Sequence, residues 1–261
     1  MDESVVLTKL LRQDRTIVVV GAAAIALIGW AYLFYEGWAM QHMDLVAMAM
    51  PSTGAWSLMD LLLVFAMWAV MMVAMMVPSA TPMLLTFATI NRSRRAKGKA
   101  FVPVWVFLGG YLVLWTAFSL AATLAQWGLH SLALISPMMV STSPMLGSVL
   151  LIAAGIYQWT PFKQACLKHC RTPLQFLLTC WQDGTAGAFL MGLRHGAYCL
   201  GCCCLLMAVL FAVGVMNLAW IAGLSVFVLL EKIIPRGLWV AKVAGLFLMG
   251  FGGWMALSTG T

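Results

Sequence analysis

Four cysteines lie within one short apolar stretch of the chain, at Cys199, Cys202, Cys203 and Cys204. In a helix of about 3.6 residues per turn, Cys199, Cys203 and Met207 follow at intervals of four and share one narrow face. Cys202 flanks that face, and His195 extends it by one turn if the helix begins early enough. The face would present thiols, a thioether and an imidazole, which are ligands that suit a soft metal ion such as Cu(I). The alternative is that the small cysteines and Gly201 only let two membrane helices approach closely.

A methionine-rich segment earlier in the chain offers a second set of soft ligands. Met71 and Met75 are four residues apart and Met76 follows directly, so thioethers line one helical face. Pro78 and Pro82 have no backbone N–H to donate, so we expect a broken helix here that lines a site or cavity. The alternative is that these methionines are adaptable apolar fillers of a proline-kinked helix.

A third group consists of Cys166 and Cys170, with His169 beside them. The spacing places both sulfurs on one side of a helical turn, and nearby basic residues favour the reactive thiolate; these are Lys163, Lys168 and Arg171. We expect the pair in a cytoplasmic loop, where disulfides are rare, and as a free, metal-capturing or redox-active pair. The alternative is two idle thiols in a basic loop.

The elements that must position these side chains are membrane helices. Hydrophobic residues make up 63% of the 261-residue chain and charged residues 9%, whereas an ordinary soluble domain is about a quarter charged. A span needs about 20 apolar residues. The uncharged runs therefore predict an all-α, polytopic helix bundle, one integral membrane domain over residues 1–261 with about seven spans. Their limits are 16–36, 58–78, 101–128, 144–160, 196–216, 217–234 and 240–258.

The basic residues predict the orientation, since short loops rich in Lys and Arg stay on the cytoplasmic side. With residues 1–15 as a cytoplasmic tail, all fifteen Lys and Arg residues fall inside and the C-terminus lies outside. Residues 172–193 are then an interfacial or re-entrant stretch, because Asp183 and Gly184 interrupt them. The net charge of +7 is a topology signal in this interpretation, which excludes nucleic acid as a partner and predicts a bacterial inner-membrane protein.

This topology brings the three groups together. The second span would run inward and the fifth outward, so Met75 and Met76 should meet Cys199 and its neighbours at the same depth. The loop pair would then lie above an intramembrane site. The predicted turn from His130 to Ser143 lies on the other side. Glu231 and Lys232 close the sixth span and are expected to be interfacial.

The chain resembles a bacterial family of predicted metal-binding integral membrane proteins, over roughly residues 58–255. The resemblance rests on long spaced motifs: Ala74-Met-Met-Val-Pro-Ser79 with Pro82; Tyr157-Gln158 with Pro161, Lys163, Cys166, Cys170, Arg171 and Pro173; Gly192-x-x-x-Gly196-x-x-Cys199-x-Gly201-Cys202-Cys203 with Leu206 and Met207; then Met216-Asn217 and Glu231-Lys232. Cys204 departs from the pattern, which has tryptophan there, and adds a thiol on the opposite face. The resemblance implies a membrane-embedded fold that binds metal.

Together these patterns predict a protein that handles a soft metal ion, Cu(I) first and Zn(II) second, for transport or delivery. The expected ligands are Cys199, Cys202, Cys203, Met207, Met75, Met76 and His195, with Cys166 and Cys170 as a donor or acceptor pair. The expected partners are the lipid bilayer and a metallochaperone or a larger membrane complex. No nucleotide-binding or hydrolase motif appears, so we expect no enzyme. The alternatives are a non-catalytic accessory subunit that packs through its apolar surface, a thiol redox enzyme, and a haem protein.

Overall fold

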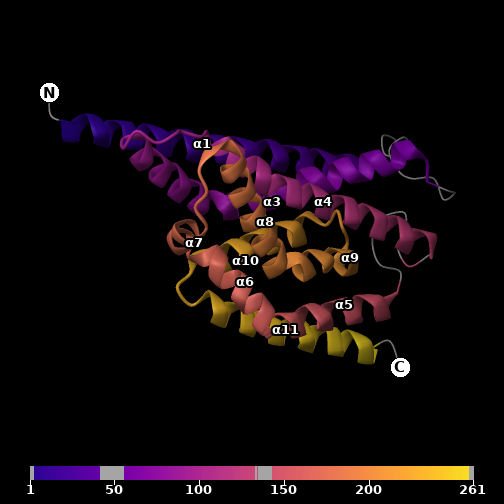
Figure 1. Cartoon of the computed structure of the whole chain (residues 1–261). Helices are drawn as coiled ribbons and strands as arrows, with labels where there is room; N and C mark the ends of the chain where they lie inside the picture. Colours follow the sequence, from indigo (N-terminus) through magenta and orange to yellow (C-terminus); the bar gives the residue numbers. More distant parts are fainter. Residues whose placement is uncertain (1–2, 42–55, 133, 135–142, 259–261) are drawn as a thin grey trace.

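The structure is a computed structural model that describes residues 3–41, 56–132, 134 and 143–258, and every regular element in these ranges is a helix. The prediction of an all-α fold is therefore confirmed for the described residues. The helices are α1 (Glu3–Gln41), α3 (Leu58–Arg95), α4 (Val104–Ser131), α5 (Pro144–Tyr157), α6 (Pro161–Arg171), α7 (Pro173–Cys180), α8 (Gly184–Ala208), α9 (Leu210–Val213), α10 (Leu218–Ile233) and α11 (Gly237–Ser258). The long helices pack side by side, and the start of α1 and the end of α11 lie at opposite ends of the bundle (Figure 1).

Five of the described helices are long and apolar enough to cross a membrane, and six if the bent pair of α5 and α6 is one span. The predicted count of seven is not confirmed. The axis bends by 65° between α5 and α6, so the predicted span 144–160 ends early. Helix α10 replaces the predicted span 217–234 and has 16 residues. At 1.5 Å per residue it is roughly 24 Å long, shorter than the hydrocarbon core of a typical bilayer.

The stretch 172–193, predicted as one interfacial or re-entrant segment, is divided between two helices, which corrects the prediction. Its first part is α7, and its second part is the beginning of α8, whose candidate span runs from Gly184 to Val213 instead of 196–216. The expected interruption at Asp183 and Gly184 is real: Asp183 is the N-cap of α8, and Gly184 has φ of +82°. A hydrogen bond from Trp181 and the nearby Arg94 guanidinium hold the pKa of Asp183 below its ordinary value. The polar break thus separates two helices and does not make one hairpin.

Helix α3 continues through Pro78 and Pro82, so the predicted broken helix is wrong. Hydroxyl groups reinforce the backbone carbonyls of the proline turn. The Met76 carbonyl accepts hydrogen bonds from Ser79 Oγ (2.9 Å) and from the Tyr111 hydroxyl (3.2 Å). Thr81 Oγ1 donates to the Val77 carbonyl at 3.1 Å. Pro78 and Pro82 instead leave the carbonyls of Ala74 and Pro78 without an N–H donor, and the helix continues past both prolines.

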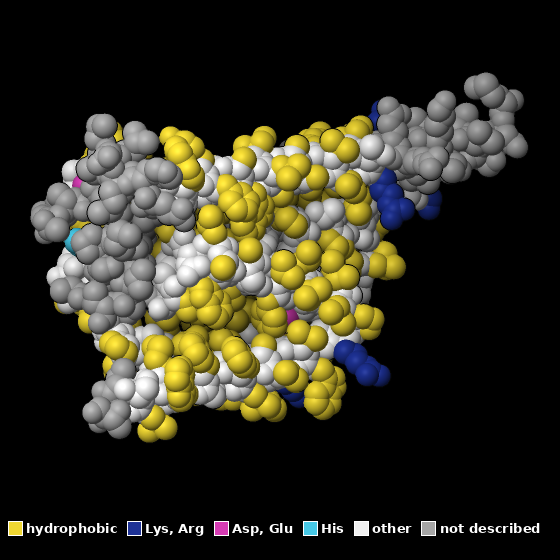
Figure 2. All heavy atoms as spheres, turned by 180° about the vertical axis from the view of Figure 1, so that it is seen from behind, with side chains coloured by type: hydrophobic (Ala, Val, Ile, Leu, Met, Phe, Trp, Pro, Cys, Tyr) yellow, Lys and Arg dark blue, Asp and Glu magenta, His cyan; other side chains and the backbone are white. Residues whose placement is uncertain are grey.

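The surface fits a lipid environment. Large apolar side chains are exposed along the outer helices, among them Leu27, Ile28 and Phe34 on α1 and Phe247 and Trp254 on α11. Figure 2 shows this apolar surface over the middle of the bundle, with the visible Lys and Arg side chains gathered at one end. The helices make this a multi-pass membrane protein. The predicted turn 130–143 lies mostly outside the described residues.

Candidate metal centre

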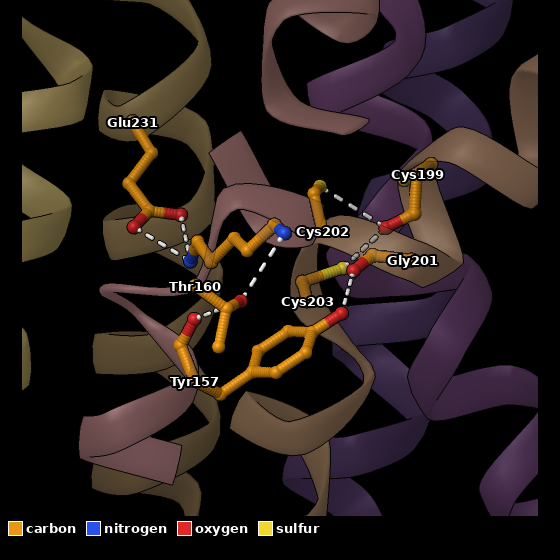
Figure 3. Close-up of polar contacts among 8 residues, drawn as sticks. Tyr157, Thr160, Cys199, Gly201, Cys202, Cys203 and Glu231 are labelled. Carbon is orange, nitrogen blue, oxygen red and sulfur yellow. Dashed lines mark hydrogen bonds and ion pairs between the residues drawn. The ribbon is translucent and has the colours of Figure 1, made fainter. Parts of the chain in front are cut away.

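Helix α8 carries the central cysteines, and they point into the protein. Cys199, Cys202, Cys203 and Met207 are completely buried. The thiols of Cys202 and Cys203 donate to the Cys199 carbonyl at 3.1 and 2.9 Å, as Figure 3 shows. Because α8 begins at Gly184, His195 belongs to the same helix and extends the buried stripe by one turn, as predicted.

Glycines allow α8 to approach α4 very closely. A Cβ atom at Gly192 would lie 1.9 Å from the Phe107 carbonyl oxygen, and one at Gly110 would lie 2.1 Å from the Phe189 carbonyl oxygen. No larger residue fits either position without moving a backbone, which is the usual reason for small residues between membrane helices. This close contact brings Tyr111, the residue after Gly110, against the cysteine stripe.

The Cys199 sulfur of α8 is contacted by polar side chains from two other helices. The Tyr111 hydroxyl of α4 lies 3.1 Å from Cys199 Sγ, and Lys232 Nζ of α10 lies 3.0 Å from the same sulfur. Lys232 also donates to Ser79 Oγ of α3 at 2.8 Å. The Tyr111 hydroxyl donates to the Met76 carbonyl as well, so the methionine segment is two hydrogen bonds from the Cys199 sulfur.

Helix α6 adds a fourth thiol to this cluster. Cys170 is buried and near enough to interact with the thiols of Cys199 and Cys202. Cys166 of α6 is also buried, but its sulfur packs against α8 at Gly201. The predicted loop pair above the site is therefore wrong, because Thr160 caps a helix here and Pro161 begins it. The helix packs Cys170 into the site itself.

The basic residues around these thiols have other partners. Lys163 is fully buried, and its Nζ forms an ion pair with both carboxylate oxygens of Glu231 at 2.9 and 3.1 Å. Arg171 donates to the backbone carbonyls of Ile234 and Pro235. Glu231 and the adjacent Lys232, predicted as interfacial, are both buried inside the helix bundle. These cations connect α6 and α8 to α10 and do not surround a loop.

His195 lacks polar partners of its own. Its ring stacks against Tyr111 at 5.5 Å between centroids, and Phe176 and Phe107 are at 5.8 and 6.1 Å. Both ring nitrogens are buried and make no hydrogen bond. Buried polar atoms are nearly always satisfied, so an orphaned imidazole needs an explanation. A ligand at the site would supply one.

The thioethers predicted as ligands are buried as well. Met75 and Met76 have no exposed surface, and the Met75 carbonyl accepts a bond from Ser225 Oγ of α10 at 3.5 Å. Within the described ranges, no three or more His, Cys, Asp or Glu side chains are arranged to hold a metal ion directly. The donors are therefore gathered in one region without forming a finished coordination sphere.

Residues 65–255 match the PpoB2 family model, whose description is copper chaperone. The chain belongs to this copper chaperone family. The matched region runs from α3 to the end of α11 and includes every candidate ligand on these helices. No curated protein and no solved structure matches the chain significantly. The prediction of a copper-handling membrane protein is confirmed by the family.

The donors gathered here fit copper as the cargo of a copper chaperone. Thiols and thioethers select soft ions, and imidazole also suits copper. Chaperones of this kind are usually non-catalytic, in line with the expectation that this chain is not an enzyme. The orphaned ring of His195, beside Cys199 in the helix, agrees with a copper-binding role for this region.

Three residues of this region were not among the predicted ligands. Ser79 belongs to the Ala74-to-Ser79 motif and Lys232 to the Glu231-Lys232 motif. Both residues were therefore part of the family pattern, but no role was predicted for either. Tyr111 carries no such signal. It follows one of two consecutive glycines in an apolar helix, and only the packing of α4 on α8 brings it to Cys199.

Proposed function

We propose that this protein binds Cu(I) within the membrane at a thiol cluster of Cys170, Cys199, Cys202 and Cys203, and passes the ion to an acceptor. The observation that supports this most directly is the position of Lys232 Nζ, 3.0 Å from Cys199 Sγ, in a region where the thiols of Cys202 and Cys203 are buried against the Cys199 carbonyl. Packing alone explains small residues between helices, but it does not explain a lysine directed at one of them.

Lys232 reduces the free-energy cost of a negatively charged copper site inside the protein. A Cu(I) ion held by two or three thiolates carries a net negative charge, and a buried charge is costly unless it is paired. Lys232 Nζ already lies 3.0 Å from Cys199 Sγ, inside the bundle. The ammonium group compensates the negative charge of the loaded site.

Loading requires a small rearrangement of the thiols. Cys202 and Cys203 now donate to the Cys199 carbonyl, and rotation about χ1 releases both sulfurs from the helix backbone. His195 and the thioethers of Met75, Met76 and Met207 are the additional ligands of this proposal. Because several possible ligands lie close together, copper can enter and leave by ligand exchange, as delivery requires.

The proposal also covers the identity of the metal, the orientation in the membrane and the exchange partner, as the sequence predicts them. Cu(I) is preferred to Zn(II) because thioethers lie beside the thiols. The orientation has the N-terminus in the cytoplasm of a bacterium and the C-terminus outside the inner membrane, with a metallochaperone or a larger membrane complex as the exchange partner. The exposed apolar surface needs only lipid to cover it, so it gives no separate support to an accessory-subunit role.

A competition titration of Cu(I) against a chromogenic chelator tests the proposal on detergent-solubilised protein under reducing conditions. Cys199→Ser should weaken high-affinity binding at least about tenfold, which corresponds to about 1.4 kcal/mol. Cys180→Ser is the matched control, since Cys180 ends α7 and its Sγ contacts Thr179 Oγ1 at 3.7 Å. Equal affinities for wild type, Cys199→Ser and Cys180→Ser would refute the proposed site.

A further inference from the structure

Cys204 of α8 and Cys166 of α6 lie on the side of α8 that turns away from Cys199. At about 100° per residue, Gly201 and Cys204 are about 60° apart around the helix, and both are at least about 140° from Cys199. A Cβ atom at Gly201 would lie only 2.8 Å from Cys166 Sγ. The missing side chain of Gly201 thus leaves the space that the Cys166 sulfur fills, one turn from Cys204.

Tyr157 joins these two cysteines from the end of α5. Its hydroxyl donates to the Gly201 carbonyl, as Figure 3 shows, and also interacts with the Cys204 thiol. Cys166 Sγ lies at Gly201, and Cys204 follows Gly201 by three residues, on the same side of α8. Tyr157 at the end of α5 and Cys166 on α6 both contact α8 at Gly201.

The two cysteines differ in their access to the surroundings. Cys166 is 6% exposed, whereas Cys204 is only partly buried. Two thiols with a nearby hydroxyl satisfy Cu(I), which binds soft ligands in low coordination numbers. Cys202 precedes Cys204 by two residues on α8 and its thiol donates to the Cys199 carbonyl, so it links the two groups of thiols along the helix.

We infer that Cys166 and Cys204 form a second Cu(I) site, a transfer site from which the ion reaches the Cys199 cluster through Cys202. This inference rests on the proposed function and assigns Cys166 to a different site from Cys170. Cu(I) replaces the thiol protons of Cys166 and Cys204, and exchange with Cys202 then moves the ion without any change of oxidation state. The Tyr157 hydroxyl positions Cys204.

Cu(I) stoichiometry on the full-length protein in detergent tests the inference. The wild type should bind a second equivalent that the double variant Cys166→Ser/Cys204→Ser lacks, while this variant keeps the tighter site. The double variant Cys170→Ser/Cys199→Ser should show the reverse loss. A wild type that binds one equivalent, retained in Cys166→Ser/Cys204→Ser, would overturn the transfer site and leave the proposed function intact. A wild type that binds no Cu(I) would refute the proposed function itself.

A second measurement does not depend on the double variants folding. Alkylation by N-ethylmaleimide, mapped by mass spectrometry, should modify Cys204 in the copper-free wild type and be slowed at least about tenfold by one added equivalent beyond the first. Cys180 serves as the internal reference because it is also partly buried. Protection of Cys204 that persists in Cys166→Ser, or no protection at any Cu(I) ratio, would overturn the inference.

Discussion

Lys232 Nζ lies 3.0 Å from Cys199 Sγ, and both side chains are buried inside the helix bundle. Lys232 is also bonded to Ser79, so its position is fixed by α3 as well as by α8. A buried ammonium group needs partners that accept hydrogen bonds or carry negative charge. A thiolate-bound Cu(I) would provide that negative charge at the same place.

We therefore expect Lys232→Met to weaken Cu(I) binding at least about tenfold, because the loaded site would keep an uncompensated buried negative charge. Chelator competition at constant pH measures the affinity. Lys168→Met is the control, since Lys168 is exposed on α6. An affinity in Lys232→Met equal to that of Lys168→Met would contradict the charge-compensating role.

The close contact of α4 and α8 gives a prediction with a neighbouring control. Gly110→Ala should destabilise the protein by about 2 kcal/mol or more, because the new Cβ would overlap the Phe189 carbonyl and push α8 and its cysteines away from Tyr111. Gly109→Ala meets nothing within 4 Å and should be neutral or slightly stabilising. Thermal unfolding in detergent compares the two, and similar melting temperatures would contradict the packing described for this pair of helices.

The buried ion pair of Lys163 and Glu231 should be important for stability. Glu231→Gln leaves a buried lysine without its counter-ion and should cost about 3 to 5 kcal/mol. Replacing both residues, as Lys163→Met/Glu231→Leu, should cost much less than the sum of the single changes. Asp183→Asn removes the partner of Arg94 in an exposed pair and should have a much smaller effect. Additive single effects at Lys163 and Glu231 would show that the two charges are not coupled.

Reporter fusions test the orientation. Fusions after Ser93 and Lys168 should report a cytoplasmic location, and fusions after Ser141 and Thr261 an external one; Ser141 and Thr261 lie outside the described residues. The opposite ends at which α1 starts and α11 finishes support this arrangement (Figure 1). A cytoplasmic C-terminus would mean that the bent pair α5–α6 or the short α10 does not cross.

The sequence was sufficient for the helical class and for the buried stripe on α8, because the spacing of Cys199, Cys203 and Met207 matches the helical period. It was insufficient where the outcome depends on packing between distant segments. Proline chemistry predicted a broken α3, but the helix continues through Pro78 and Pro82, packed between α1 and α4. No local signal could show this.

Charge patterns misled for a related reason. Glu231 and Lys232 were predicted to lie at the membrane interface, and their buried partners could not be predicted because each is far away in the chain. Cys170 read as a loop thiol because basic residues surround it, although one of them, Lys163, points to Glu231. Pairings of this kind are set by the tertiary structure.

The central claim is that the sulfur of Cys170 on α6 and that of Cys199 on α8 hold one Cu(I) ion. X-ray absorption at the copper edge, on protein loaded with one equivalent under reducing conditions, tests it most directly. The account predicts a Cu(I) edge with sulfur neighbours at about 2.3 Å, and a lower sulfur count in both Cys170→Ser and Cys199→Ser but not in Cys180→Ser. A first shell of nitrogen or oxygen alone, or a sulfur shell that neither change alters, would contradict it.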